Sequence, residues 1–369
     1  MSDCFERGKK TEGEDCDPLA LPTISVVITN YNYGRWLQGA VESARLADET
    51  IVVDDGSTDG SRDLMKTLSG ITPILKSNGG HVSAINAGFM ASRGDVVIFL
   101  DADDRLGEKC IPAIKANWTA GVSKFQWGLL TVDEDDKPRG VLYPTFKHHH
   151  TPQWCRDQMR RQCFYDAPPT SGNAWSRPFL ERVMPLPMLG SSMWANDDYM
   201  HLLAPYFGDV VSLIDVYGFY RVHTRQMSSF GQHNVDRLER VTGDEMLRYE
   251  AVSDFLVHHG HHRLDALRWS SHTINRIFLR RLGRSREPAL PLILRHIAAT
   301  ARQDSGSISK ARNIVLGLLL VIPYRPLALR LAREKYDDEF RSRRRQSLHH
   351  ARELMGRRLS RKPGRPAPQ

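Results

Sequence analysis

The chain has 369 residues and a formal net charge of +8, with 41% hydrophobic and 25% charged residues. This composition is typical of globular proteins and excludes a globally disordered chain. The 5 cysteines have neither metal-site nor disulfide-framework spacing, so we expect free thiols in a reducing cytoplasm. Residues 1–21 lack the apolar core of a secretory signal, and we expect them to form a flexible arm.

The first predicted elements alternate between strands and helices. Apolar runs rich in β-branched residues predict strands at 23–29, 50–53 and 71–75. Apolar residues at helical spacing predict helices that begin near Trp36, Ser61 and His81. This alternation predicts βαβ units, and therefore a mostly parallel sheet flanked by helices.

A fourth predicted strand, 96–100, is apolar throughout and is followed at once by Asp101, Asp103 and Asp104. Such a run is typical of a central strand buried on both faces. Carboxylates this close together repel each other unless a cation lies between them. Oxygen ligands suit Mn²⁺ or Mg²⁺, so the sequence predicts a divalent-cation site; a solvated acidic turn is the alternative.

Polar residues also follow the first and second predicted strands, as Thr29-Asn30 and as Asp55-Gly56-Ser57. The carboxyl ends of parallel strands meet at one edge of a sheet, where α/β proteins bind ligands. The chain has neither G-x-G-x-x-G after the first strand nor G-x-x-x-x-G-K-[ST]. A nucleotide at this edge would therefore be held by carboxylates and a metal rather than by a glycine-rich loop.

Residues 22–104 resemble the nucleotide-binding half of the GT-A glycosyltransferases of family 2. These are inverting enzymes that use nucleotide sugars. The matching stretches are 28–32, 51–59, 78–80 with 86–88, and 100–104. The resemblance implies an α/β fold of the GT-A class, a Rossmann-like, mostly parallel sheet with flanking helices. One departure is Ile85, because many members carry an arginine at that position.

The resemblance also implies roles for single residues. Thr29 and Asp55 would contact the nucleotide base. Asp101 and Asp103 would bind Mn²⁺ or Mg²⁺, with Asp103 as the direct ligand. The full donor site expected in this chain comprises Thr29, Asn30, Asp55, Gly56, Ser57, Asn78, Asp101, Arg221 and His223.

A predicted helix that opens within 191–199 carries Asp197 and Asp198. Acidic residues favour a helix amino end on dipole grounds, so an ordinary cap explains one of them. Family members often place an acidic pair here, and its second member is the usual candidate base. By this resemblance Asp198 would be the general base, with Asp197 as the alternate.

The segment 217–223 is similar to a Tyr-Arg-x-His segment that often ends the family's catalytic domain. Arg221 and His223 would then supply positive charge near the diphosphate. The alternative for Arg221 is an ion pair with a structural carboxylate such as Asp215.

Two stretches fit the acceptor side. Residues 168–175 predict a rigid polar loop, in which Thr170 and Ser171 offer hydroxyl groups. A sugar could stack on Trp175 or Trp194, although a buried core position is the commoner role for a tryptophan. The run His148–His150 predicts an exposed loop, because three consecutive histidines cannot all face one ion.

Helical patterns continue from about Val235, and an apolar stretch follows at 314–322. This stretch is shorter than the roughly 20 residues of a spanning helix, so it predicts either a buried core helix or an interfacial membrane contact. Residues 333–369 hold 12 Lys or Arg and 5 Asp or Glu, a net +7. We expect residues 310–369 to bind an anionic membrane surface; a solvated tail is the alternative, and nucleic-acid binding is not expected.

These patterns predict an N-terminal arm (1–21), a glycosyltransferase domain (22–232, divided at residue 104), a helical extension (233–332) and a basic tail (333–369). We expect a metal-dependent inverting transferase that uses a UDP-, GDP- or dTDP-sugar and a glycan or lipid-linked acceptor. Its expected location is the cytoplasm, at the inner face of the membrane. The alternatives are a polyprenyl-phosphate sugar transferase and a non-catalytic nucleotide-sugar-binding scaffold.

Overall fold

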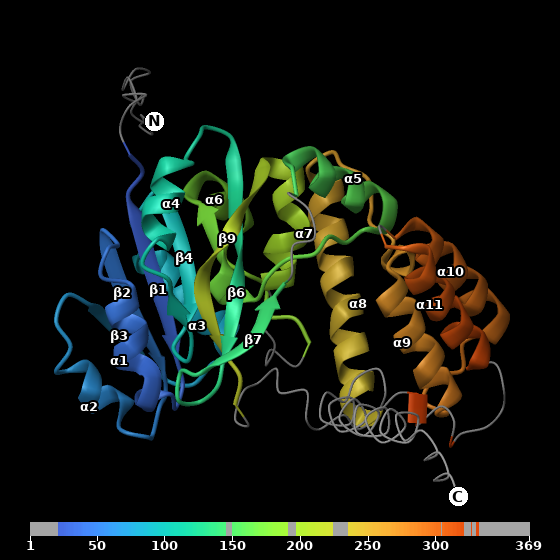
Figure 1. The fold of residues 1–369 in the computed structure, drawn as a ribbon, viewed down its shortest axis with the longest axis horizontal. Helices are drawn as coiled ribbons and strands as arrows, with labels where there is room; N and C mark the ends of the chain where they lie inside the picture. The colour runs from blue at the N-terminus through green and yellow to red at the C-terminus, as the bar shows by residue number, and fades with distance from the viewer. Residues whose placement is uncertain are drawn as a thin grey trace, which may run out of the picture.

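The computed structural model describes residues 21–144, 150–190, 197–223, 235–303 and 305–320, together with 326, 330 and 331. The elements are arranged as in Figure 1. The strands are β1 (Ile24–Asn30), β2 (Glu49–Asp55), β3 (Thr72–Lys76), β4 (Val96–Asp101), β5 (Arg105–Leu106), β6 (Val122–Val132), β7 (Pro138–Tyr143), β8 (Asn173–Ser176) and β9 (Asp209–Arg221). The helices are α1 (Gly34–Ser43), α2 (Ser61–Met65), α3 (His81–Ala91), α4 (Cys110–Ala116), α5 (Pro152–Gln162), α6 (Arg177–Val183), α7 (Asp197–Phe207), α8 (Val235–His258), α9 (Ser270–Arg281), α10 (Ala289–Arg302) and α11 (Ser307–Leu319), with short 3₁₀ turns at Thr170–Gly172 and Ala266–Arg268.

The strands in the described part of the chain form one mixed sheet in the order β3-β2-β1-β4-β8-β6-β9-β5, and β7 pairs with β6. β3, β2, β1 and β4 are parallel neighbours, as are β6 and β9. β8 is antiparallel to both β4 and β6. The register sets Thr29 beside Asp101, and Asn30 beside Asp54. The predicted GT-A-like α/β fold is therefore confirmed, and its polar strand ends meet at one edge.

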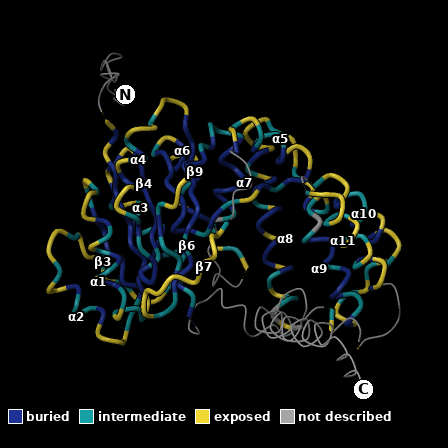
Figure 2. The backbone as a smooth tube through the Cα atoms, in the orientation of Figure 1, coloured by how far each residue is buried: buried dark blue, intermediate teal, exposed yellow. Residues whose placement is uncertain are grey.

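Helices cover both faces of this sheet. On one face α1, α2 and α4 pack on side chains such as Val26, Ile28 and Leu100. On the other face α3, α5, α6 and α7 pack on Val27 and Phe99. Because alternate residues of a strand point to opposite faces, the wholly apolar strands β1 and β4 supply both cores. Figure 2 shows these central strands as continuously buried.

The long helix α8 connects this core to a second group of helices (Figure 1). Tyr249, Val252 and Leu256 of α8 pack in the same core as α7. Nearer its amino end, Leu238 packs against a separate core formed by α9, α10 and α11. A domain boundary between residues 232 and 233 stays a prediction, since α8 contributes to both cores.

Helix α11 carries the start of the apolar stretch 314–322. Gly317 and Leu320 lie on its buried side, whereas Ile308, Val315 and Leu318 are exposed. The helix thus packs on the protein with one side only. This arrangement combines features of the two that the sequence allowed, a buried core helix and an interfacial membrane contact. Within the described residues, no helix has both the length and the apolar character needed to cross a membrane.

Candidate active site

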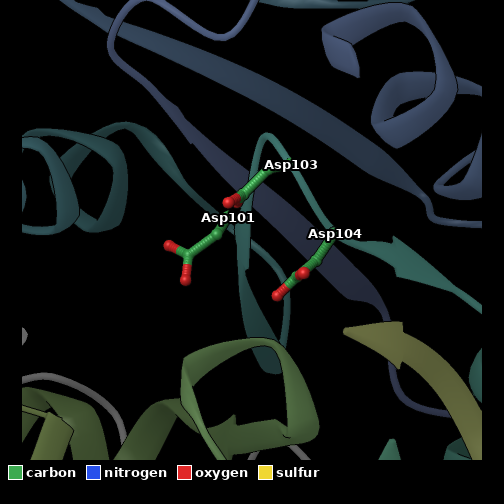
Figure 3. Close-up of side chains that lie close together, drawn as sticks. All are labelled: Asp101, Asp103 and Asp104. Atoms are coloured by element: carbon green, nitrogen blue, oxygen red, sulfur yellow. The ribbon is translucent and has the colours of Figure 1, made fainter. Parts of the chain in front are cut away.

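Three carboxylates gather where β4 ends. Asp101 is the last residue of β4, and Asp103 and Asp104 lie in the turn that follows it. One oxygen from each carboxylate lies within 4.8 Å of the other two. Figure 3 shows the three side chains projecting to the same side of this turn. The acidic cluster predicted from the sequence is therefore a compact set of oxygen ligands at the carboxyl edge of the sheet.

Asp101 is held by side chains from three other segments. The hydroxyl of Thr29, on the neighbouring strand β1, donates to its Oδ1 over 3.2 Å. Nε2 of His81, the first residue of α3, lies 2.8 Å from the same oxygen. The backbone N–H of Asp101 donates to the hydroxyl of Ser171. Thr29 thus lies against the acidic cluster, and its predicted contact with a nucleotide base stays a prediction.

The other two carboxylates contact the end of β9. Nε2 of His223 lies 2.9 Å from Oδ2 of Asp103, and both side chains are almost fully buried. The backbone N–H of Arg221 donates to Oδ1 of Asp104 over 2.8 Å. The ring of His223 also packs against Trp36, with ring centres 4.6 Å apart. His223 therefore contacts Asp103, a proposed metal ligand, directly. Its predicted contact with the donor stays a prediction.

The guanidinium of Arg221 is buried and occupied by acceptors within the chain. Its Nε donates to the carbonyl of Asp103, its Nη1 to the carbonyls of Asp133 and Glu134, and its Nη2 to Asp136. The expectation that Arg221 supplies positive charge near the diphosphate stays a prediction, because all of these bonds are made to groups of the chain itself. The arginine fixes the turn after β4 against the turn after β6. Its ion-pair partner is Asp136 and not the suggested Asp215.

The acidic cluster has the chemistry of a cation site. Burial raises the pKa of Asp103; the hydrogen bond from His223 opposes this effect, and repulsion by Asp101 adds to it. Burial, followed by repulsion from Asp103 and Asp101, raises the pKa of Asp104 well above its usual range. Among the described residues, Oδ2 of Asp104 is buried without a hydrogen-bond partner. A divalent cation would relieve this repulsion and use the orphaned oxygen, so the donor set fits Mn²⁺ or Mg²⁺.

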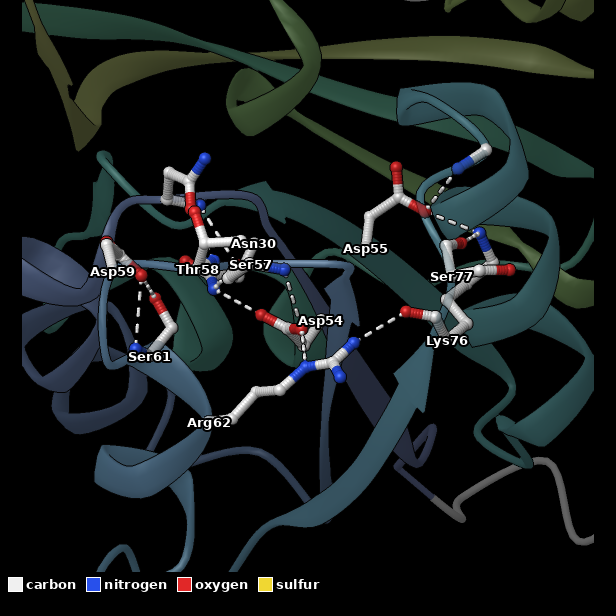
Figure 4. A network of polar contacts seen from close by, with 12 residues as sticks. Asn30, Asp54, Asp55, Ser57, Thr58, Asp59, Ser61, Arg62, Lys76 and Ser77 are labelled. Carbon is white, nitrogen blue, oxygen red and sulfur yellow. Dashed lines mark hydrogen bonds and ion pairs between the residues drawn. The ribbon is translucent and has the colours of Figure 1, made fainter.

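The loop after β2 is held by Asp54 and Asp55. Asp54 accepts hydrogen bonds from the Asn30 amide, the Ser57 N–H and Nε of Arg62. Figure 4 shows the Arg62 guanidinium between this carboxylate and the carbonyl of Lys76. Burial favours a higher pKa for Asp54, but hydrogen bonds from Ser57, Arg62 and Asn30 outweigh it and lower the pKa.

The carboxylate of Asp55 is also largely engaged. It accepts hydrogen bonds from the N–H groups of Gly79 and Gly80, and it forms an ion pair with Lys76. Asp55 therefore anchors the 78–80 turn, and its predicted contact with the base stays a prediction.

Gly56 has a positive φ of 85° and lies tightly against Asn78. A Cβ atom at Gly56 would lie 2.7 Å from the backbone nitrogen of Asn78. The Ser57 hydroxyl accepts from the N–H of Asn32 and from the Asn30 amide. Asn30, Asp55, Gly56, Ser57 and Asn78 thus lie in contacting loops at the ends of β1, β2 and β3, and the side chain of Asn78 is exposed.

Asp198 lies in the first turn of α7, and its side chain is 49% exposed. Helix α7 ends at Phe207, and the chain turns at Gly208 into β9, which runs in the direction of β4 and β6. The amino end of α7 is thus directed toward the edge where β4 and β9 end (Figure 1). An Arg248 nitrogen lies 3.5 Å from Oδ2 of Asp198. Asp197 begins the same helix, and its side chain lies outside the described residues.

The residues expected on the acceptor side lie in different environments. Trp175 is 1% exposed and belongs to the central strand β8, so it does not offer a face to a sugar; the core role is the correct one. Thr170 and Ser171 form a buried 3₁₀ turn, and Ser171 contacts Asp101. Trp194 lies outside the described residues.

The sequence analysis missed several side chains that contact the predicted site residues. His81 and Lys76 contact Asp101 and Asp55, respectively, and Arg248 contacts Asp198. Asn86 bonds to both backbone groups of Leu186, and its neighbour Ile85 is buried in the core. The only available signal for His81 was its place directly after the Gly79-Gly80 turn at the start of a helix.

Comparison with known proteins gives consistent results. The model described as glycosyl transferase family 2 matches residues 25–175. An uncharacterized glycosyltransferase of Nostoc sp. is 33% identical over 259 residues, which cover 64% of this chain and 77% of that protein. An undecaprenyl-phosphate 4-deoxy-4-formamido-L-arabinose transferase of Pseudomonas paraeruginosa is 39% identical over 99 residues, or 23% of this chain and 29% of that protein. The crystal structure of S. aureus TarS 1–349 with UDP-GlcNAc has a TM-score of 0.49 and 18% identity, covering 87% of this chain and 92% of that one.

Proposed function

Because the chain belongs to glycosyltransferase family 2, we propose that it transfers a sugar, with inversion, from a nucleotide-diphosphate sugar to a hydroxyl group of a glycan or lipid-linked acceptor. The observation that carries this proposal is the set of three carboxylates within 4.8 Å at the carboxyl edge of β4. The loop system of Asp54, Asp55 and Gly56 lies beside this edge and is the proposed site of the nucleoside.

In this proposal Asp101 and Asp103 hold a divalent cation, which when bound supplies Lewis-acid stabilisation of the departing diphosphate. The chain's own residues prepare these ligands. His81 and Thr29 orient Asp101 from two elements, and His223 orients Asp103. Arg221 ties the turn that carries Asp103 and Asp104 to β9. Side chains fixed in this way keep their oxygens in place before the donor arrives.

Inversion in a single displacement needs a general base on the face of the sugar opposite the diphosphate. We assign this role to Asp198, with Asp197 as the alternate. The carboxylate would accept the proton of the attacking hydroxyl as the new glycosidic bond forms and the bond to the diphosphate breaks. Its half-exposed position at the amino end of α7 leaves it accessible to an acceptor.

The test is a comparison of binding with turnover in Asp198→Asn. We expect this variant to bind a nucleotide sugar and Mn²⁺ as the parent chain does, but to lose sugar transfer by about 100-fold or more. Asp215→Asn, an exposed position on β9, is the matched control and should leave both unchanged. Undiminished transfer by Asp198→Asn would refute the assignment of the base. It would also favour Asp197→Asn as the next variant to test.

The similarity to undecaprenyl-phosphate transferases supports a second candidate, transfer to a polyprenyl phosphate. The matched part covers only 29% of the relative from Pseudomonas paraeruginosa, so the acceptor of that relative comes to this chain only as a proposal. An assay with undecaprenyl phosphate followed by lipid extraction would separate the two acceptor classes. A non-catalytic nucleotide-sugar-binding scaffold would bind the donor but show no transfer in either assay.

We also propose that the chain rests on an anionic membrane surface, at the cytoplasmic face. Ile308, Val315, Leu318 and Leu319 form an exposed apolar stripe along one side of α11. Their spacing follows one face of a helix, and the exposed Arg312 lies beside them. The 12 basic residues of 333–369 follow in the sequence. Apolar and basic residues together are typical of interfacial membrane contacts.

A further inference from the structure

A pocket lies among the C-terminal helices, between α10 and the 3₁₀ turn at Ala266–Arg268. Its volume of about 350 Å³ falls within the roughly 300 to 1,000 Å³ that is usual for small-ligand sites. Its walls include Asp265, Leu267, Arg268, Leu294, Arg295 and Arg302. Figure 1 shows α8 between α10 and the sheet, and no residue of the acidic cluster lines this pocket. The pocket is therefore separate from the proposed donor site.

Three arginines and one aspartate line the pocket, which gives its wall a net charge of +2. The single carboxylate, Asp265, offsets little of this charge. Its Oδ1 accepts from the backbone N–H of Leu267, and its Oδ2 lies 4.0 Å from Nε of Arg268. In the part of the chain that the structure describes, Arg295 and Arg302 have neither a hydrogen-bond nor an ion-pair partner. Two guanidinium groups are thus available to an anion.

The third guanidinium, that of Arg268, is already held in place. Its Nη1 donates to the carbonyl of Arg160, on α5, over 3.2 Å. Its Nε faces Asp265, so Nη2 is the nitrogen left for a ligand. A guanidinium fixed in this way loses little side-chain entropy when an anion binds.

Helix capping explains only part of this arrangement. Arg302 lies in the last turn of α10, where the helix dipole favours a cation. Arg295 lies two turns earlier, so the dipole does not account for it. Its charge also acts on a neighbour in α9: burial lowers the pKa of Arg276, and Arg295 lowers it further. A bound anion would relieve this repulsion between cations.

The charge and shape of the pocket favour a phosphate group. Guanidinium groups match the oxygens of phosphate, and a phosphate monoester carries about −1.5 to −2 charge at pH 7, close to the opposite of the wall. A pocket of this size holds a single ester, whereas a nucleic acid needs a basic groove that follows several phosphates. Leu294 is 57% exposed beside the arginines and offers apolar surface to a substituent of the ester.

We propose that this pocket binds a phosphate monoester, with its phosphate group between the three guanidinium groups and its apolar substituent against Leu294. Two sources share this chemistry, a soluble phosphorylated small molecule and the headgroup of a lipid such as phosphatidic acid. The site is additional to the donor site, and the proposal does not rest on the proposed function.

The test is isothermal titration calorimetry of the full chain in EDTA, so that no cation at the acidic cluster can bind the probe. We expect butyl phosphate to bind, and its affinity to fall about tenfold or more in Arg295→Gln and in Arg302→Gln, because each variant loses a charge-assisted hydrogen bond. Butyl sulfate, which has the same shape and a single charge, should bind about tenfold more weakly. Arg240→Gln, at an exposed position of α8, removes the same charge elsewhere and is the matched control.

A third probe, dihexanoyl phosphatidic acid below its micellar concentration, separates the two sources. Tighter binding of this lipid than of butyl phosphate identifies a lipid headgroup as the occupant. Equal or weaker binding identifies a soluble ester. Either result supports the phosphate site, provided that both arginine variants weaken it.

The proposal is overturned if butyl phosphate does not bind, if butyl sulfate binds as tightly, or if Arg240→Gln loses as much affinity as the two pocket variants. Parent-like affinity in both pocket variants would overturn it as well. Binding of a single-stranded oligonucleotide that is lost in Arg295→Gln, without binding of butyl phosphate, would assign the arginines to nucleic acid instead. Arg295 and Arg302 are exposed, and circular dichroism verifies that their variants fold. Nucleotide-sugar binding with Mn²⁺, measured in parallel, should be unchanged in both variants.

Discussion

Nε2 of His223 lies 2.9 Å from Oδ2 of Asp103, across 120 positions of the sequence. This contact closes the end of β9 over the turn that follows β4. Asp103 is buried at this point, and burial raises the pKa of its carboxyl, with Asp101 close by. The imidazole contacts the Asp103 carboxylate in its buried position, and we expect the proposed metal site to depend on this contact.

We therefore predict that His223→Ala weakens Mn²⁺-dependent binding of nucleoside diphosphates by about 10- to 100-fold, the usual effect of losing a group that orients a metal ligand. Isothermal titration calorimetry with UDP, GDP and dTDP in the presence of Mn²⁺ measures this loss. His262→Ala, at an exposed position after α8, serves as the control. Parent-like affinity in His223→Ala would show that Asp103 is positioned without the imidazole.

A second prediction concerns the fully buried carboxylate of Asp54. Its hydrogen bonds from Asn30, Ser57 and Arg62 lower its pKa below the unfolded value of 3.8, despite the opposing effect of burial. Such a group stabilises the fold fully above the unfolded pKa, and the stabilisation is lost as pH falls through the folded pKa. We expect Asp54→Asn to reduce the free energy of unfolding by about 2 kcal/mol at pH 7.

Because protonation removes the same charge from the parent chain, the difference between parent and Asp54→Asn should shrink below about pH 4. Urea unfolding across this pH range measures it. Asp63→Asn is the matched control, since that carboxylate is exposed and pairs with Lys66. A difference that stays constant down to the acid limit would contradict a role for the Asp54 charge.

Two glycines allow the cost of a strained backbone conformation to be measured apart from the cost of a steric clash. Gly56 and Gly60 both have positive φ, at 85° and 87°, but only Gly56 lies against another segment. We predict that Gly60→Ala costs about 1 to 2 kcal/mol of unfolding free energy, the cost of the backbone conformation alone. Gly56→Ala should cost clearly more, since its new methyl group meets the backbone nitrogen of Asn78.

We also expect Gly56→Ala to weaken nucleotide binding and Gly60→Ala to leave it unchanged, because only the first displaces the 78–80 turn. Urea unfolding and calorimetry on the two variants test this pair of predictions. Equal losses of stability in both variants would show that the turn at Asn78 moves aside freely.

A fourth prediction tests the exposed stripe of α11. We expect Val315→Asp combined with Leu318→Asp to lower binding to vesicles of equal parts phosphatidylglycerol and phosphatidylcholine by about tenfold or more, because each apolar side chain would no longer enter the interface. Co-sedimentation of the full chain measures the bound fraction. Ile214→Asp on β9 is the control, since it removes an exposed apolar side chain far from α11 in the sequence. Unchanged sedimentation of the double variant would reject a membrane role for this stripe.

The first half of the sheet could be predicted because each parallel strand is an apolar run with polar residues at its end. The strand expected at 23–29 is β1, Ile24–Asn30, and the one expected at 96–100 is β4, Val96–Asp101. The family assignment, the α/β fold and the glycosyltransferase class are confirmed. The antiparallel strand β8 was missed, because Asn173–Ser176 is short and follows a Pro- and Gly-containing stretch that predicts a loop.

The other differences depend on contacts that no sequence pattern indicates. The guanidinium of Arg221 donates hydrogen bonds to residues 103, 133, 134 and 136. No local sequence pattern indicates these partners. His150 was expected in an exposed loop, but it is buried and stacks on Trp154 with ring centres 3.8 Å apart. His148 and His149 lie outside the described residues. The contacts that bury Arg221 thus span 85 to 118 positions of the sequence, whereas the contact that His150 makes with Trp154 is local.

The most direct measurement is calorimetric titration of the full chain with UDP-, GDP- and dTDP-linked sugars, with and without Mn²⁺. We expect at least one donor to bind when Mn²⁺ is present, to bind about tenfold or more weakly without it, and to lose this dependence in Asp103→Ala. Asp215→Ala should behave as the parent chain does. If no nucleotide sugar binds under either condition, or if Asp103→Ala keeps the full metal dependence, the rim of β4 does not hold the donor through a cation.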